Sequence, residues 1–261
     1  WNRKRYLHKI KKISSVISQL EDKKSRFAPA IVGLVEVENA SVVEDLVNHP
    51  NLRKHHFDYV HYDSPDERGI DVALLYNKKI FELISSESFP LYVESREGER
   101  DYTRDILVVT GKLRGELIHV LVNHWPSRRD GADLTEYKRI KAAELARSIV
   151  DEIQSKTMNA NIFIMGDFND DPSSNSVKEH LVNMGLAGLG AIPVDGKWNL
   201  FDQIIISNNF LEKENNRLHF QKAELYNKDW LKVFKGKYKG SPYRTYIGKW
   251  YQGGFSDHFP V

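Results

Sequence analysis

The chain has 261 residues, of which 41% are hydrophobic and 28% charged, with a formal net charge of +2. This length fits one large domain or two small ones, and the charge alone indicates neither a nucleic acid nor an anionic membrane as a partner. Because cysteine is absent, disulfide bonds and thiolate chemistry are excluded. No apolar run approaches the ~20 residues of a transmembrane helix, and nothing indicates a compartment.

The first half of the chain predicts a basic amphipathic helix followed by several strands. Residues 3–20 carry apolar side chains at helical spacing, and lysine and arginine crowd the rest. The apolar run 30–39 predicts a buried strand with acids at its end. Ser41 and Glu44 form a capping box that predicts a short helix. Further strands are expected at 57–62, 70–76, 80–84, 104–109 and 116–122, the last two as neighbours.

The second half begins with the longest helical stripe, at residues 134–156. A buried strand at 162–165 follows, then a helix from Pro172 to about 184 and strands at 201–207 and 217–225. No repeat or linker is visible, so residues 1–261 are expected to form one domain. About ten strands among three or four helices favour two packed sheets with helices outside.

Polar residues of one chemical kind occur at five predicted strand ends. A bundle of sheets collects such ends on one rim, where loops form sites. Carboxylates with two histidines and no thiols suit Mg²⁺ or Mn²⁺ better than structural zinc. Each group taken alone also fits an ordinary turn. The residues are Glu36, His124, Asp167 with Asn169, Asp202, and Asp257 with His258.

The order of the surrounding motifs resembles the endonuclease/exonuclease/phosphatase superfamily, which has the DNase I-like fold. The motifs are Val-Glu-Val-Glu-Asn (35–39), Asn-His-Trp-Pro-Ser (123–127), Gly-Asp-Phe-Asn (166–169), Phe-Asp-Gln-Ile (201–204) and Ser-Asp-His (256–258). The resemblance implies an α/β class, four-layer α/β/β/α sandwich of two mixed sheets. It also implies a hydrolase that cleaves phosphoesters with Mg²⁺ or Mn²⁺. Since the family usually begins with a strand before the first helix, the chain is expected to lack its first and last strand segments.

The resemblance assigns the metal to carboxylates and the attacking water to another carboxylate. Glu36 resembles the principal metal ligand and Asp257 a further ligand. Asp167 resembles the group that orients or deprotonates the water. His124 occupies the position of a histidine that acts as general acid in the nuclease and sphingomyelinase branches. The abasic endonucleases have tyrosine at that position, so the sequence favours the other branches.

The remaining assignments concern the phosphate. His258 resembles the histidine that contacts the scissile phosphate, and Asp202 the acid that orients it. Asn169 resembles the amide that holds a phosphate oxygen, and Arg104 and Asn123 are expected to bind substrate beside it.

The substrate stays open at this stage. A phosphodiester of nuclease type is favoured, because basic and aromatic residues follow position 227. A phosphomonoesterase, a lipid phosphodiesterase and an inert binding module are the alternatives, and the aromatic residues also suit packing under a long loop. The protein is expected to be a monomer whose partner is its phosphoester substrate. Asp71 lies in an apolar strand and needs a partner, either His124 or an arginine.

Overall fold

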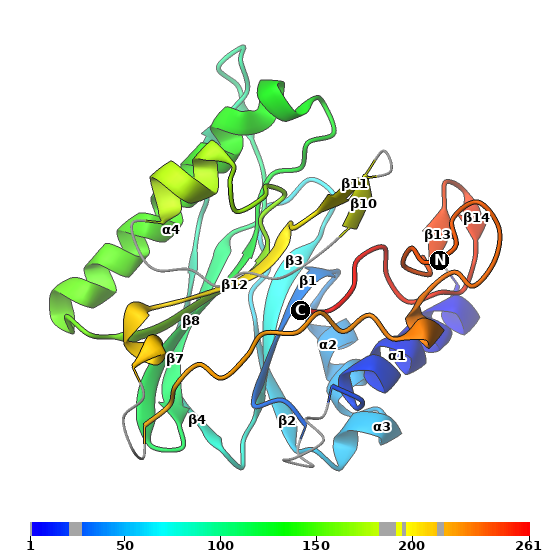
Figure 1. Cartoon of the computed structure of the whole chain (residues 1–261), viewed down its shortest axis with the longest axis horizontal. Helices are drawn as coiled ribbons and strands as arrows, with labels where there is room; N and C mark the ends of the chain where they lie inside the picture. The colour runs from blue at the N-terminus through cyan, green and yellow to red at the C-terminus, as the bar shows by residue number, and fades with distance from the viewer. Residues whose placement is uncertain (1, 21–27, 183–191, 195–196, 213–216) are drawn as a thin grey trace.

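Two β-sheets form the centre of the molecule (Figure 1). The computed structural model describes all residues except 1, 21–27, 183–191, 195–196 and 213–216. The first sheet is antiparallel, in the order β1-β3-β2: β1 (Ile31–Val37), β2 (Phe57–His61) and β3 (Asp71–Asn77). The second, in the order β12-β9-β8-β7-β4, has β4 (Phe81–Phe89), β7 (Ile106–Leu113), β8 (Glu116–His124), β9 (Asn161–Asp167) and β12 (Asp202–Ile206).

The described residues form four α-helices beside the sheets: α1 (Arg3–Ile17), α2 (Ala40–Val47), α3 (Pro50–Arg53) and α4 (Ala132–Lys156). The smaller elements are η1 (Ser176–Leu181), η2 (Asn208–Leu211), η3 (Asp229–Leu231), and the strand pairs β5 (Val93–Glu94) with β6 (Arg100–Asp101), β10 (Ile192–Val194) with β11 (Lys197–Asn199), and β13 (Tyr246–Ile247) with β14 (Trp250–Tyr251). Among the described residues, no helix is long and apolar enough to cross a membrane.

Three clusters of buried side chains lie between successive layers of the molecule. One joins α1, α2 and α3 to the outer face of the first sheet. A second fills the space between the two sheets. The third joins α4 and η1 to the outer face of the second sheet. Helices therefore cover both outer faces of a pair of packed sheets, as Figure 1 shows.

Strand β3 illustrates why these residues adopt this arrangement. Val72, Leu74 and Tyr76 point between the sheets, whereas Ala73 and Leu75 point toward the helices. An unbroken apolar run suits a strand that is buried on both faces. Each fully buried leucine contributes about 1.5–3 kcal/mol relative to an exposed one.

The strand register brings three polar residues together at the same end of neighbouring strands in the second sheet. β8 and β9 are parallel, and His124 is paired with Asp167 in the register. β9 and β12 are antiparallel, and Asp202 is paired with the same Asp167. The second sheet therefore aligns residues that lie 43 and 35 positions apart in the sequence.

Gly166 permits the close approach of β8 to β9 beside these strand ends. Its φ is +134°, and a Cβ added there would lie 1.9 Å from the Asn123 carbonyl oxygen. We expect Gly166→Ala to lower the free energy of unfolding by about 2 kcal/mol or more, from the clash and the strained φ together. Gly115→Ala is the matched control, since Gly115 has φ +90° and nothing within 4 Å. Equal losses in urea denaturation of the two variants would contradict the proposed clash.

Most predicted elements are confirmed, with shifted boundaries, but three local predictions are wrong. The helix at 41–47 is present, yet its cap is Asn39, whose side chain accepts from the Val42 N–H at 3.1 Å, instead of a Ser41 capping box. Within its described part, the helix expected from Pro172 is only the short η1, and residues 183 and 184 lie outside the described chain. Residues 217–225 form no strand, because the Leu218 and Phe220 N–H groups donate to Glu116 Oε1 and the Phe210 carbonyl instead of to a sheet.

Strand β1 is the edge of its sheet. Within the described residues it pairs only with β3, and residues 256–261 are not assigned to a strand. A groove of about 1080 Å³ is lined by residues of β1, by Met165 and Ile204, and by Phe259 to Val261. The expectation that strand segments are lacking at both ends stays a prediction.

Candidate functional site

Three strand ends and the C-terminal loop bring the expected residues together. Ligand atoms of Asp167, Asp202 and His258 lie within 4.8 Å of one another. His124 Nε2 lies 3.8 Å from Asp167 Oδ2. Asp167 and Asp202 are also among the residues that line the groove beside β1. The site is thus built from residues that a rigid sheet holds in register.

His258 forms a short contact with Asp202, with 2.6 Å between Nδ1 and Oδ2. Burial lowers the pKa of His258, but the hydrogen bond and the negative charges of Asp202, Asp167 and Asp257 outweigh burial and raise this pKa to about 9. The imidazole is therefore a cation at neutral pH, with Nδ1 donating to Asp202.

Asp167 is a buried carboxylate among other acids. Burial raises its pKa most, the positive charge of His258 and the Asn169 N–H oppose this, the negative charges of Asp202 and Glu36 add to it, and the net result is a pKa of about 6. The Asn169 N–H donates to Asp167 Oδ1 at 2.8 Å, which fixes the carboxylate. A carboxylate with a pKa near the working pH suits general-base chemistry.

His124 differs from His258 in its protonation. Burial lowers the pKa of His124 well below 6.5, and the positive charge of Arg104 lowers it further. His124 is therefore neutral at pH 7. The expected role of His124 as general acid stays a prediction.

Asn169 and Glu36 share an unusual backbone conformation. Their φ values are +51° and +58°, in the left-handed region that most side chains avoid. The Asn169 amide donates to the Trp125 carbonyl at 2.9 Å. Glu36 lies at the bulge between Val35 and Val37 of β1. Strained residues of this kind occur often at functional sites.

Arg104 and Asn123 are framework residues in the structure. The Arg104 guanidinium is buried and donates to the carbonyls of His124 and Trp125 at 3.1 and 2.6 Å, and to Asp66 at 2.9 Å. Asn123 is fully buried, and its amide bonds the Leu121 carbonyl and the Trp125 indole. Their polar groups hold the end of β8, and the expected substrate contacts stay a prediction.

The expected metal ligands Glu36 and Asp257 are not members of the compact group formed by Asp167, Asp202 and His258. Both are near enough to act electrostatically on the Lys9 ammonium. The Glu36 side chain is 57% exposed and lies 3.6 Å from the Arg68 guanidinium. The two carboxylates therefore line the solvent side of the site.

A second group of possible metal ligands contains Asp71. The residues that contact Asp71 differ from those expected from the sequence. Asp71 contacts His61 at 3.0 Å and accepts from the Ser64 N–H and hydroxyl at 2.8 and 2.7 Å. Asp63 completes this group. The predicted partner, His124 or an arginine, is wrong. Both Asp71 oxygens already have protein partners, so the carboxylate is satisfied without an ion.

Sequence reasoning missed Arg68, Asp66 and Lys9. Arg68 is 46% exposed beside Glu36, and Asp66 is buried against Arg104. Both lie in a segment that reads only as a polar turn, so no periodic pattern singles them out. Lys9 is part of the basic face of α1, and its ammonium donates to Thr245 Oγ1 and the Phe255 carbonyl next to the His258 loop.

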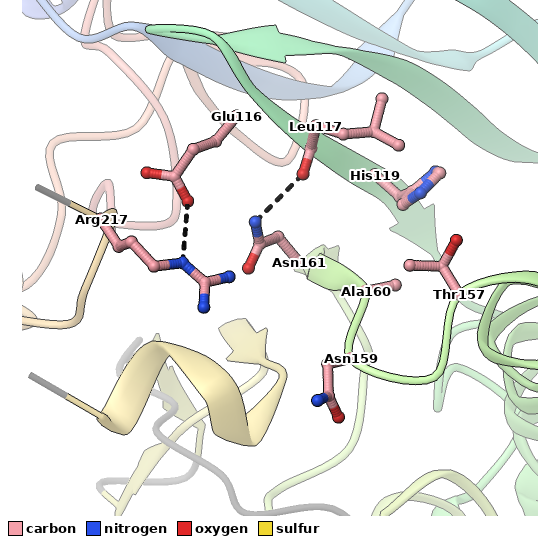
Figure 2. Close-up of a pocket in the computed structure, with 8 residues that line it drawn as sticks. All are labelled: Glu116, Leu117, His119, Thr157, Asn159, Ala160, Asn161 and Arg217. Atoms are coloured by element: carbon pink, nitrogen blue, oxygen red, sulfur yellow. Dashed lines mark hydrogen bonds and ion pairs between the residues drawn. The ribbon is translucent and has the colours of Figure 1, made fainter. Parts of the chain in front are cut away.

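A smaller pocket of about 290 Å³ lies at the opposite end of β8 and β9 (Figure 2). Figure 2 shows Arg217 beside Glu116 and the Asn161 amide donating to the Leu117 carbonyl. Glu116 is the one carboxylate in its lining. This pocket lacks the paired carboxylates and protonated histidine found at the other end of the sheet.

Three comparisons place the chain among known proteins. A family model described as the Endonuclease/Exonuclease/phosphatase family matches residues 1–261. No curated protein matches the chain. Humanized TDP2 of D. rerio has a TM-score of 0.56 at 14% identity, covering 79% of this chain and 78% of that one.

Two further solved structures have the same degree of similarity. A mannosyl-6-phosphatase of Bacteroides thetaiotaomicron has a TM-score of 0.55 at 17% identity, over 76% of this chain and 78% of that one. The human nocturnin catalytic domain, solved with a bound sulfate anion, has a TM-score of 0.50 at 18% identity, over 69% and 70%. At these identities the likeness concerns the fold. The family match over the whole sequence confirms the resemblance seen in the motifs, and the chain belongs to the endonuclease/exonuclease/phosphatase family.

Proposed function

We propose that residues 1–261 act as a single, monomeric, divalent-metal-dependent phosphodiesterase of nuclease type. The observation that carries the proposal is the compact group of Asp167, Asp202 and His258 at one sheet edge. It combines a carboxylate whose pKa is about 6 with a histidine whose pKa is about 9. At neutral pH such a pair offers a base and a fixed positive charge at one place.

Asp167 is assigned to the attacking water. Its Oδ1 is held by the Asn169 N–H, whereas Oδ2 faces His124 at 3.8 Å. A water that donates to this carboxylate would be oriented toward phosphorus and would lose its proton to Asp167. The rigid strand end keeps the carboxylate in place while this happens.

His258 is assigned to the negative charge that develops on the phosphate oxygens. Its Nδ1 is committed to Asp202, so Nε2–H is the donor left for an oxygen of the substrate. Asn169 is assigned to hold another phosphate oxygen. His124, or a water molecule beside it, is assigned to give a proton to the leaving oxygen, which balances the proton that Asp167 takes from the attacking water.

The chemistry of the donors fits a hard divalent cation. Glu36 and Asp257 are carboxylates, and thiols are absent from the chain. The accumulation of acids contributes to the raised pKa of Asp167, a repulsion that a cation would relieve. Glu36 and Asp257 would hold Mg²⁺ or Mn²⁺, which when bound polarises the phosphate and neutralises its developing charge.

The test is a substrate panel supplied with Mg²⁺ or Mn²⁺: oligonucleotides, bis-p-nitrophenyl phosphate, phosphomonoesters and phospholipids. We expect cleavage of the oligonucleotide and of the artificial diester, and loss of both activities on addition of EDTA. Release of free phosphate from the monoesters alone would replace the proposal with a phosphatase, and cleavage of phospholipid alone with a lipid phosphodiesterase. Metal binding without any hydrolysis would make the chain an inert binding module.

A further inference from the structure

Residues 230–254 differ in charge and composition from the rest of the chain. This segment contains six lysines and arginines, seven aromatic residues and no Asp or Glu. Because the whole chain has a net charge of +2, the other residues together have a net charge of −4. The positive charge is therefore concentrated in a segment that ends two residues before Ser256-Asp257-His258.

The aromatic residues of this segment are divided between the core and the surface. Phe234 and Trp250 are each 77% exposed, and Tyr238 is 57% exposed. Exposed lysines stand beside them: Lys235 lies over the Phe234 ring and Lys237 over the Tyr238 ring, at 5.9 and 5.6 Å from the ring centroids. Aromatic residues are enriched at binding interfaces relative to the rest of a protein surface.

The segment is a built structure, which holds these rings in place. The Val233 N–H donates to the Ser241 carbonyl at 2.9 Å, the Gly240 N–H to the Val233 carbonyl at 2.8 Å, and the Tyr243 N–H to the Leu231 carbonyl at 2.7 Å. Leu231 is buried in a small cluster with Val16, Phe255 and Phe259. Strands β13 and β14 form a second hairpin that carries Trp250.

Helix α1 supports this segment and extends its positive charge. In Figure 1 the β13–β14 hairpin lies beside the N-terminal part of α1. The Arg5 guanidinium lies 4.8 Å from the Tyr251 ring centroid, and His8 Nδ1 lies 2.8 Å from the Tyr251 hydroxyl. Lys9 donates to Thr245 Oγ1 at 2.8 Å. The Lys12 ammonium lies 4.3 Å from the Phe255 ring centroid, on the same side of the helix.

We propose that Phe234, Tyr238 and Trp250, with Lys235, Lys237, Lys239, Arg244 and Lys249, form a binding surface for single-stranded nucleic acid. We call it the aromatic-basic surface. Its rings would stack on successive bases, and its cations would contact the phosphates between them. The surface would select the substrate of the proposed function. The proposal rests on that function, since the bond cleaved is the phosphodiester of the bound nucleic acid.

The composition favours a nucleic acid over an anionic membrane. Within the surface, rings and lysines alternate over a few residues, so no continuous apolar face is available to enter a bilayer. Among the exposed large hydrophobic residues of the described part of 230–254, Ile247 is the one aliphatic residue. The Arg128 guanidinium is paired with Asp170 and donates to the Asn169 carbonyl, so it is not part of the surface.

The experiment measures binding apart from hydrolysis. Fluorescence anisotropy of a labelled oligo-dT 20-mer is recorded with the full chain in EDTA, over a series of salt concentrations. We expect Phe234→Ala and Trp250→Ala each to weaken binding about tenfold. We expect the triple variant Lys235→Gln, Lys237→Gln, Lys239→Gln to weaken it further and to reduce the slope of log K against log salt by about 2.

Matched controls come from exposed residues outside the aromatic-basic surface. Tyr92→Ala removes an exposed ring, and Lys141→Gln with Lys156→Gln removes exposed charges on α4, so these variants should bind like the unchanged chain. Hydrolysis of bis-p-nitrophenyl phosphate should be the same in every variant of the surface. Unchanged affinity in the surface variants, or preference for phosphatidylserine vesicles or duplex DNA over oligo-dT, would overturn the inference. Oligo-dT binding without hydrolysis of any ester would refute the proposed function alone.

Discussion

Asp167→Asn is expected to lower kcat for bis-p-nitrophenyl phosphate by at least ~10²-fold. The amide cannot take a proton from water, although its oxygen can still accept the hydrogen bond that the Asn169 N–H donates at 2.8 Å. Replacement of the carboxylate also removes charge from a buried position next to Asp202, so folding should not be impaired. The loss should therefore appear in kcat, with the denaturation midpoint kept or raised. Steady-state kinetics and urea denaturation are the two measurements.

The control is Asp151→Asn. Asp151 lies on the exposed surface of α4, where its carboxylate forms an ion pair with Arg147. This variant should retain the full kcat. If Asp167→Asn also retained it, Asp167 would not be the base and the proposed mechanism would fail. A fall in kcat that accompanies a large loss of stability would count against the view that the carboxylate acts on water.

The fold could be predicted where apolar runs are long and where polar groups follow them directly. Strand β9 and helix α4 are examples, because their patterns depend on burial along one element. Residues 217–225 show where this reasoning fails. They contain alternating apolar residues, but a strand also needs a partner with free backbone groups, and here Glu116 and Phe210 take that place. Sheet partners are a property of the tertiary structure, which one segment does not contain.

The site could be predicted in its chemistry but only partly in its geometry. Asp167, Asp202 and His258 were identified from motifs, and the sheet register explains why they meet. Arg104 and Asn123 occur in the same motifs, yet burial commits their donors to backbone carbonyls and a neighbouring side chain. The protonation states of His124 and His258 could not be predicted from the sequence either, because they depend on burial and on neighbouring charges. Two histidines that look alike in the sequence have pKa values moved in opposite directions, because burial dominates at His124, whereas the hydrogen bond and the negative charges around His258 outweigh burial.

Asp202→Asn is expected to lower the pKa of His258, so that kcat/KM falls at a lower pH than in the unchanged chain. The pKa of about 9 arises because the hydrogen bond to Asp202, and the charges around it, outweigh burial. Without the Asp202 charge, burial continues to act, so the pKa should fall by about 1 to 3 pH units. At pH 8 the variant histidine would then be neutral in half of the molecules or more, and kcat/KM should be lower than that of the unchanged chain by up to ~10²-fold.

The difference in kcat/KM between Asp202→Asn and the unchanged chain should narrow as the pH is lowered, because His258 of the variant regains its proton. NMR titration of His258 in the metal-free protein measures the pKa directly, with His119 as an internal control that lies outside the site. Asp58→Asn, which removes a 44% exposed carboxylate paired with Lys78, should leave both the titration and the rate profile unchanged. A His258 midpoint that stays near 9 in Asp202→Asn would show that Asp202 does not hold the charge of this histidine. A lowered midpoint with an unchanged rate at pH 8 would show instead that the reaction does not need the protonated imidazole.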